Sequence, residues 1–342
     1  MSRAPAISII TPVWNGLPYI KECIGSVLAQ EFQNWELLIG DNGSTDGTRD
    51  YLAQLNDSRI HIYEHEINLG ISGNLNFLFA KANGPLAYIL SADDWFHPEG
   101  LSSAMDEWNC ARESVAFICF SPDAGLFKVA QYAYKTLPKH ISPTMSRLAF
   151  FLFGNFTGNV SNVSVRISAI NSSGGFVEHL RTAQDFEMWR RLARNNDLIL
   201  SDKKVVFVRA HEGSATHYMT QKGEDYGPLI TIYEDLIEQL SLEYPRKKLI
   251  FFFNTQISSQ YFRTAIKHAL SGRFTYMKAV LNAKSTILWN TWRQLIICVP
   301  LALFVNLREY LGIKLVQRFL DQTKYSSRDG KPGVMSTPKI KL

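Results

Sequence analysis

The chain has 342 residues, 46% of them hydrophobic, and a formal net charge of +5. This length exceeds the usual size of one domain, so we expect one large domain and a smaller region. Charge is mixed along the chain and no basic stripe is interleaved with aromatic residues, which argues against a nucleic-acid partner. The four cysteines have neither Cys-x-x-Cys spacing nor a histidine cluster, so they indicate neither a zinc site nor a disulfide framework. A reducing compartment fits, and no apolar signal segment precedes the first apolar run, so export by that route is not expected.

Strands and helices alternate in the first 120 residues. Short β-rich runs predict strands at 6–10, 35–39, 60–63, 86–90 and 115–120, and helical patterns lie between them at 18–29, 49–55 and 72–82. This alternation is typical of βαβ units and a parallel sheet, so we predict the α/β class. Ligands bind such sheets at the carboxyl ends of the strands. The loops 11–15 and 41–46 and the pair Asp93-Asp94 are therefore expected along one rim.

The apolar run 86–90 leads into two adjacent carboxylates, Asp93 and Asp94. Neighbouring aspartates repel each other, and oxygen ligands at a strand end suit Mg²⁺ or Mn²⁺, which keep open positions for substrate phosphates. The alternative is a helix N-terminus where Asp serves as a cap and complements the dipole. The rim shared with the other two loops favours a nucleotide site.

The loops exclude two kinds of nucleotide site. No Gly-x-Gly-x-x-Gly run follows the first strand and no P-loop occurs, so neither a dinucleotide dehydrogenase nor a P-loop enzyme is expected. Asp41 and Asn42 can accept hydrogen bonds from a base or ribose, and Trp14 offers a flat face for stacking. The alternatives are that Asp41 caps its loop, Asn42 is a turn residue and Trp14 is a core residue.

Three runs, 7–16, 35–46 and 91–94, resemble family 2 of the inverting glycosyltransferases in order and spacing, over about the first two hundred residues. The resemblance implies a GT-A fold that binds a nucleotide-diphosphate sugar, with a UDP-sugar expected, and a divalent metal. It also implies that Asp94 holds the metal and that the donor is bound by Pro12, Trp14, Asn15, Asp41, Asn42 and Asp93. Two positions depart from the family pattern: Asn42 and Ser91 stand where an Asp is usual or frequent. Asn42 leaves the choice of base open, whereas Ser91 still leaves Asp94 for the metal.

A helix with an acidic first turn follows the flexible pair Gly174-Gly175. Its apolar residues Phe186, Trp189 and Leu192 recur at helical spacing, so Asp185 is expected in the first turn. Capping explains an acid there without any chemistry. The resemblance instead implies a catalytic carboxylate before such a helix. Asp185 is therefore the predicted base, and Glu187 is the alternative.

The region between these motifs gives weaker signals. Residues 121–143 are expected to be irregular and to carry acceptor contacts, 146–153 reads as a helix, and 160–166 reads as an edge or antiparallel strand. A strand at 204–208 leads into Arg209-Ala210-His211. A lone histidine is more often structural, but the resemblance implies that an Arg-x-His here reaches the metal or diphosphate, so His211 is a second candidate metal ligand. The Gln-x-x-Arg-Trp motif of processive members is absent, which favours a single transfer.

The C-terminal part changes character from about residue 224 to amphipathic helices, including 246–270 and 274–281. The segment 295–307 is almost entirely apolar, but it is shorter than the ~20 residues of a spanning helix and Pro300 interrupts it. It is expected either to lie in a membrane interface, flanked by tryptophan and arginine, or to pack as an ordinary helix on protein. We predict a catalytic domain at 1–220, a helical region at 221–322 and a disordered tail at 323–342.

These features predict an inverting, metal-dependent, non-processive glycosyltransferase. It would move one sugar to a hydroxyl of a glycan or lipid-linked acceptor in cell-surface polysaccharide synthesis, in the cytoplasm or on the inner face of the membrane. A nucleotidyltransferase would need a Gly-rich basic loop after the first strand, which residues 14–17 lack. A catalytically silent sugar-nucleotide-binding protein is the other alternative, suggested by Ser91, Asn42 and Gln184.

Overall fold

The computed structural model describes residues 4–121, 128–211 and 224–321. The chain divides into two compact units, Met1–Ala210 and His211–Leu342. The domain boundary predicted at 220/221 falls within residues 212–223, which lie outside the described part. The tail predicted at 323–342 also lies outside it. Both stay predictions.

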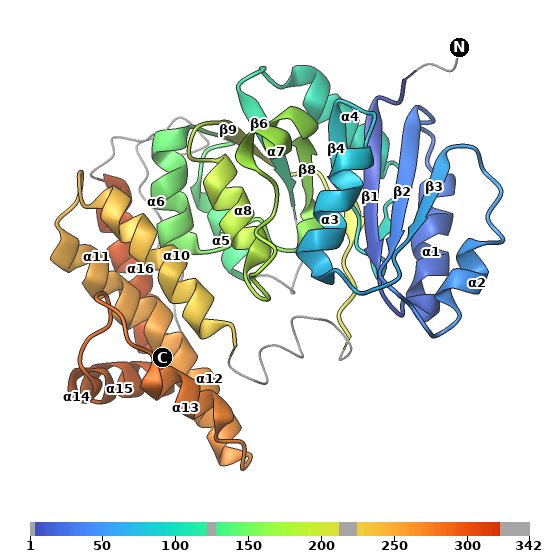
Figure 1. Ribbon diagram of the computed structural model, residues 1–342. Helices are drawn as coiled ribbons and strands as arrows, with labels where there is room; N and C mark the ends of the chain where they lie inside the picture. The colour runs from blue at the N-terminus through green and yellow to red at the C-terminus, as the bar shows by residue number, and fades with distance from the viewer. Residues whose placement is uncertain (1–3, 122–127, 212–223, 322–342) are drawn as a thin grey trace. The chain divides into compact units, whose positions relative to one another are not determined.

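The first unit is built on an eight-stranded sheet in the order β3-β2-β1-β4-β8-β6-β9-β7 (Figure 1). All neighbouring pairs are parallel except those made by β8 and β7, so the predicted mostly parallel sheet is confirmed. The strands are β1 (Ile7–Val13), β2 (Trp35–Asp41), β3 (Ile60–Glu64), β4 (Leu86–Ile89), β6 (Val115–Phe120), β7 (His140–Ile141), β8 (Val163–Arg166) and β9 (Asp197–Ser201). A separate antiparallel pair joins β5 (Trp95–Phe96) to β10 (Val206–Phe207).

Helices flank both faces of this sheet. They are α1 (Leu17–Leu28), α2 (Thr48–Leu52), α3 (Gly70–Lys81), α4 (Gly100–Cys110), α5 (Lys128–Thr136), α6 (Pro143–Phe153), the 3₁₀ turn η1 (Val160–Asn162), α7 (Ile167–Ser173) and α8 (Gln184–Leu192). In α1 the buried residues Ile20, Cys23, Ile24 and Val27 recur at helical spacing and form one core with alternate residues of β1. Helix α3 packs on β1 and β2 from the other face. The central strands are therefore buried on both sides, as parallel strands usually are.

The segment 160–166, predicted as an edge or antiparallel strand, contains β8. The strand is antiparallel, as one of the two alternatives had it, and it lies in the middle of the sheet between β4 and β6 rather than at an edge. In the structure Ser164 is fully buried, accepts a hydrogen bond from Trp108 Nε1 at 2.8 Å and donates one to the carbonyl of Ala87 at 2.7 Å. A satisfied hydroxyl therefore occupies a core position.

Two other sequence expectations were wrong in part. Residues 121–143 were expected to be irregular, yet α5 and β7 lie within them; residues 122–127 are outside the described part. The run 204–208 was expected to be the last core strand. Only its residues Val206 and Phe207 are a strand, and they pair with β5 rather than with the main sheet. The pairings of β7 with β9 and of β10 with β5 are long-range, and local composition does not record them.

The second unit is helical. Its elements are α10 (Tyr226–Leu240), α11 (Arg246–Phe252), the π-helix η2 (Phe253–Ser258), α12 (Ser259–Leu270), α13 (Thr275–Asn282), α14 (Thr291–Arg293), the π-helix η3 (Gln294–Cys298), α15 (Val299–Leu303) and α16 (Val305–Asp321). The helix predicted at 246–270 is thus interrupted at η2. There the buried Asn254 donates to the carbonyl of Ile287 at 2.7 Å and accepts from Trp289 N at 3.1 Å. This side chain ties the linker before α14 to the helix.

Among the described helices, none alone has the length and apolar composition to cross a membrane. One pair meets that test together, Thr291–Leu303 with Val305–Asp321, but the two helices are bent by 104° relative to each other.

Candidate active site

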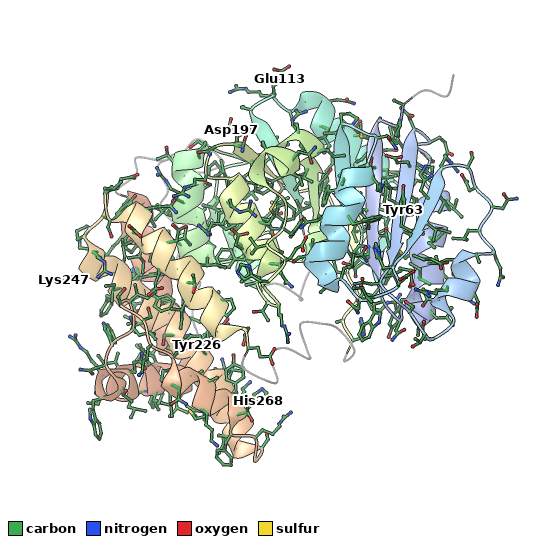
Figure 2. The ribbon with its side chains drawn as sticks, viewed as in Figure 1. Tyr63, Glu113, Asp197, Tyr226, Lys247 and His268 are labelled. Atoms are coloured by element: carbon green, nitrogen blue, oxygen red, sulfur yellow. The ribbon has the colours of Figure 1, made fainter. Side chains whose placement is uncertain are left out.

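The loops after β1, β2 and β4 lie together at the carboxyl edge of the sheet. Asn15 N donates to Ser44 Oγ at 2.8 Å, and Asn15 Oδ1 accepts from Thr45 N at 2.8 Å. A Cβ on Gly16 would lie 3.7 Å from Ala92, so the loop after β4 approaches the same place. Figure 2 shows Glu113 and Asp197 at the opposite edge, where β6 and β9 begin. The loops predicted to share one rim are therefore in contact.

Asp41 is fully buried at the end of β2. Its Oδ2 accepts hydrogen bonds from Arg49 Nε at 2.8 Å and Ser44 N at 3.1 Å. Its Oδ1 makes no hydrogen bond within the described residues. The carboxylate thus caps its loop, as the alternative reading held, and also keeps one buried acceptor. Arg49 had no part in the sequence prediction, although it follows Asp41 in the next helix.

Asn42 is buried, and its amide is used within the protein. Its Oδ1 accepts from Leu69 N at 2.8 Å, and its Nδ2 donates to Asn68 Oδ1 at 2.9 Å and to the carbonyl of Gly70 at 3.1 Å. These contacts fix the turn before α3 beside the end of β2. In this geometry Asn42 positions the rim through the 68–70 turn.

Trp14 and Pro12 lie where β1 reaches the rim. The Trp14 side chain is 59% exposed, so the alternative that it is a core residue is wrong. Pro12 pairs with Gly40 in the parallel ladder, because β1 continues three residues beyond the predicted end at Ile10. An exposed indole at the strand end leaves a flat apolar surface beside the loops.

Asp94 is the most strongly perturbed acid of the rim. It is almost completely buried, its Oδ1 accepts from Arg209 N at 2.9 Å, and the nearby Ser161 hydroxyl acts to lower its pKa. Its Oδ2 makes no hydrogen bond within the described part of the chain. Burial, and then the charge of Asp93, raise the pKa of Asp94 to about 7. A buried carboxylate with an unused oxygen is a site at which a cation would be favourable.

The donor set fits a hard divalent cation held partly by substrate. In the described ranges, no three His, Cys, Asp or Glu side chains come together as a metal-binding cluster. Mg²⁺ is usually bound through one or two carboxylates together with substrate phosphates, and Asp94 with the adjacent Asp93 supplies that number. Ser91 instead contacts Ser161, hydroxyl to hydroxyl at 3.0 Å. His211 is the first residue of the second unit, so its role as a metal ligand stays a prediction.

Arg209 holds the turn that carries both aspartates, a role the sequence reasoning missed. Its Nε donates to the carbonyl of Asp93 at 3.0 Å, and its Nη2 bonds to Glu22. The guanidinium lies over the rings of Tyr19 and Trp95, at 5.0 and 4.5 Å from their centroids. The chain after β10 is thereby fixed to the turn that follows β4.

Asp185 lies in the first turn of α8, as its spacing predicted. Its Oδ1 accepts from Phe186 N at 2.8 Å and its Oδ2 from Asn155 Nδ2 at 2.7 Å. The Thr157 hydroxyl donates to Asn155 Oδ1 at 2.8 Å, which fixes the orientation of that amide. Burial raises the pKa of Asp185, and the two hydrogen bonds oppose that rise. A held carboxyl group with a raised pKa has the properties of a general base.

One loop, residues 154–161, approaches both acids. Asn155 near its start donates to Asp185, and Ser161 at its end accepts from Ser91 N at 3.0 Å and lies close enough to Asp94 to influence the pKa of that carboxyl group. The sequence reasoning assigned these two residues no role. The only signal was the cluster of Asn, Gly, Thr and Ser between α6 and β8.

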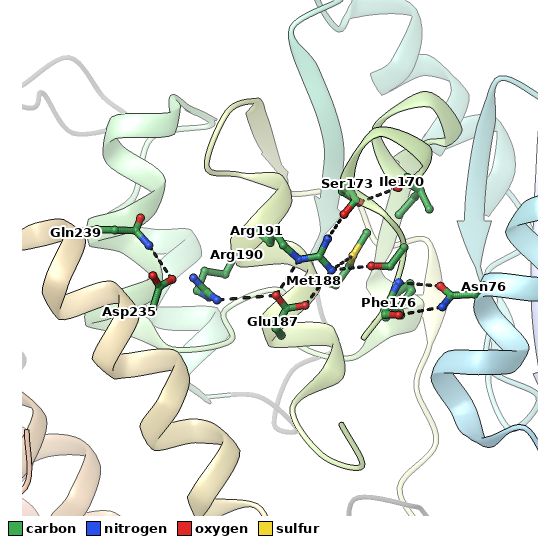
Figure 3. A network of polar contacts seen from close by, with 11 residues as sticks. Asn76, Ile170, Ser173, Phe176, Glu187, Met188, Arg190, Arg191, Asp235 and Gln239 are labelled. Atoms are coloured by element: carbon green, nitrogen blue, oxygen red, sulfur yellow. Dashed lines mark hydrogen bonds and ion pairs between the residues drawn. The ribbon is translucent and has the colours of Figure 1, made fainter. Parts of the chain in front are cut away.

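Glu187, the alternative base, is already paired. Its carboxylate accepts from Arg191 at 2.8 and 3.0 Å, and Arg191 also donates to the carbonyls of Ser173 and Gly175, as Figure 3 shows. These bonds tie α8 to the end of α7. The arrangement gives Glu187 a structural role.

Arg191→Ala is expected to destabilise the first unit by about 2–3 kcal/mol, because the mostly buried Glu187 loses its closer cation and is left with Arg190 at 3.9 Å, and two carbonyls lose their donor. Urea unfolding followed by circular dichroism measures this. Arg194→Ala, an exposed position on the next turn, is the matched control and should change the free energy of unfolding by less than about 0.5 kcal/mol. Equal effects of the two variants would contradict the structural role of the pair.

Comparison with known proteins agrees with this geometry. The family model described as Glycosyl transferase family 2 matches residues 8–169. TuaG of Bacillus subtilis, named for teichuronic acid biosynthesis, is 35% identical over 124 residues, which are 35% of this chain and 49% of that protein. WfgD of Escherichia coli, named as a UDP-Glc:alpha-D-GlcNAc-diphosphoundecaprenol beta-1,3-glucosyltransferase, is 39% identical over 88 residues, which are 26% of this chain and 35% of that protein. The chain thus spans half or less of the length of these relatives.

A solved structure matches over most of the chain. TarS 1-349 of S. aureus, crystallised in complex with UDP-GlcNAc, superposes with a TM-score of 0.59 at 18% identity, covering 93% of this chain and 92% of that one. At this identity the likeness concerns the fold, which is the predicted GT-A fold with a C-terminal helical region. Residues 8–169, slightly less than half of the chain, are therefore similar to glycosyltransferase family 2.

Proposed function

We propose that this protein is an inverting, metal-dependent glycosyltransferase that moves one sugar from a nucleoside-diphosphate donor to a hydroxyl in cell-surface polysaccharide synthesis. The observation that carries the proposal is the arrangement around loop 154–161. One end of this loop lies beside a buried carboxyl group with an unused oxygen, Asp94, and the other end holds a second carboxyl group with a raised pKa, Asp185. A cation site and a base at the two ends of one loop are the two parts that such a transfer needs.

The proposed donor site is the rim around Trp14. Its exposed indole supplies a stacking face for the base, and the unused Oδ1 of Asp41 supplies a buried acceptor for a base or ribose group. Pro12 and Asn15 shape the same rim, and Asp93 is proposed to contact ribose or sugar. A UDP-sugar is favoured because WfgD is named for UDP-Glc and the TarS structure contains UDP-GlcNAc.

The proposed cation is Mg²⁺ or Mn²⁺, held by Asp94, with His211 as a candidate second ligand. When bound, it would neutralise the charge that develops on the departing diphosphate. Asp94 must then be ionised, which its raised pKa opposes in the absence of a cation. Arg209 keeps the carboxyl group in place through its backbone N–H.

Asp185 is the proposed base. In an inverting transfer the acceptor oxygen attacks from the face opposite the leaving group, and Asp185 would take the proton of that hydroxyl. Each carboxylate oxygen of Asp185 accepts one of these hydrogen bonds, from Asn155 Nδ2 or from Phe186 N, and keeps a further lone pair for the proton.

The proposed acceptor is a glycan or lipid-linked sugar, in line with the name of WfgD. We place the reaction in the cytoplasm at the inner face of the membrane. All four cysteines are free thiols, which supports a reducing compartment.

Incubation with UDP-, GDP- and dTDP-sugars and Mn²⁺ tests the proposal. One donor is expected to release nucleoside diphosphate in a metal-dependent way, slowly in water and faster with acceptor, and NMR of the product should show the opposite anomeric configuration. Retained configuration would contradict inversion. Donor binding without any release would support the silent binding protein, and formation of a nucleotide sugar from nucleoside triphosphate would support the nucleotidyltransferase.

A further inference from the structure

The last helices of the second unit have two apolar faces. One face is buried in the unit and includes Cys298, Leu301 and Ala302. The other face is exposed and follows the same helical spacing; its large side chains are Trp292, Leu295, Ile296, Leu303, Phe304, Leu307 and Tyr310. We call this second set the outer face. The buried side of segment 295–307 agrees with the packed-helix alternative, and the membrane-interface alternative concerns the outer face.

The outer face turns a corner. Helices α15 and α16 are bent by 104°, and Leu303, Phe304 and Leu307 are exposed around the bend, Phe304 by 65%. In Figure 1 α14 and α15 form a short arm at the end of the helical unit. A corner of this kind presents three large apolar side chains together, whereas a helix in a soluble core would bury them.

The apolar side chains of the outer face are flanked by basic residues at both ends. Arg293 is exposed at one end, and Lys314 and Arg318 continue the same stripe beyond Tyr310 at the other. Glu309 is the one exposed acid between Thr291 and Leu320. After Asp321 the sequence adds five basic residues against one acidic residue: Lys324, Arg328, Lys331, Lys339 and Lys341 against Asp329.

We propose that the outer face docks on an anionic lipid bilayer. The corner residues Leu303, Phe304 and Leu307 would lie in the interface, and Arg293, Lys314 and Arg318 would lie at the headgroups. Tryptophan and tyrosine favour the interface, and arginine and lysine reach lipid phosphates with long side chains. Basic segments next to an apolar anchor strengthen binding to acidic lipids. This inference rests on the proposed function, because a lipid-linked acceptor lies in such a bilayer.

Sedimentation of the full chain with vesicles tests the proposal without any sugar transfer. We expect the protein to pellet with phosphatidylcholine vesicles containing 30% phosphatidylglycerol, and less with phosphatidylcholine alone or in 0.5 M NaCl. The triple variant Leu303→Ser, Phe304→Ser, Leu307→Ser should bind about 10²-fold more weakly. The control Leu242→Ser, Leu270→Ser changes two residues of the same unit that are even more exposed but lie outside the outer face, and it should bind like the wild type.

Binding by the triple variant equal to that of the wild type overturns the proposal, and so does an equal loss in the control. Light scattering without lipid measures whether the protein forms a dimer through the outer face. If the wild type is a dimer that does not bind vesicles, and the triple variant is a monomer, the outer face binds a second copy of the chain and the proposal is overturned. Release of nucleoside diphosphate from soluble donor is measured separately. Its failure would concern the proposed function alone.

Discussion

Asp185→Asn is expected to lower sugar transfer by about 10²- to 10⁴-fold, with donor and metal affinity almost unchanged. The substitution keeps the size of the side chain but removes the basic oxygen. It also places an amide beside Asn155 Nδ2, which donates to Asp185 at 2.7 Å in the wild type. Initial rates with saturating acceptor, together with donor titrations, separate the loss in turnover from any loss in binding.

The exchange Asn155→Asp with Asp185→Asn is the matched control. It restores a carboxylate–amide pair across the same contact, so thermal stability should recover, but the carboxylate now lies on the loop. Transfer should therefore stay low. Full activity of Asp185→Asn together with collapse in Glu187→Gln would move the base to Glu187, at the cost of its pair with Arg191.

Asp94→Asn is expected to abolish metal-stimulated turnover and to make the cation-free protein more stable at pH 8. The pKa of Asp94 is about 7 in the folded protein and near 3.8 when unfolded, so the folded state binds the proton more tightly. The stability from this proton is fully present below about pH 4 and is lost as pH rises through 7. Over roughly three pH units the wild type should lose about 4 kcal/mol that Asp94→Asn keeps.

Thermal unfolding from pH 4 to pH 8, with and without Mn²⁺, measures this difference. Mn²⁺ at pH 8 should raise the melting temperature of the wild type and leave that of Asp94→Asn unchanged, because the cation favours the ionised carboxylate. Parallel pH profiles for the two proteins would contradict the raised pKa of the buried Asp94. A melting temperature that rises equally with Mn²⁺ in both would move the cation elsewhere.

The sequence predicted those features that depend on local period and on strand ends. The alternation of elements gave the mostly parallel sheet, and the spacing of Phe186, Trp189 and Leu192 placed Asp185 correctly. Strand order was not predictable in this way, because the central place of β8 rests on backbone pairing with β4 and β6, which lie far from it in the sequence.

The partners of individual side chains were equally unpredictable from the sequence. Arg209 reaches Asp94 across more than a hundred residues, and Asn155 reaches Asp185 across thirty. No periodic pattern records such contacts. The exposure of Trp14 was also undecided, since an aromatic residue after a strand occurs both in cores and at binding sites.

Loop 154–161 makes the two acids thermodynamically reciprocal. A ligand at Asp94 that displaced the loop would change the proton affinity of Asp185 through Asn155, and protonation of Asp185 would change the affinity of that ligand by the same free energy. Donor affinity should therefore vary with pH in step with Asp185. Shortening or stiffening this loop would change that dependence while both carboxylates stayed intact.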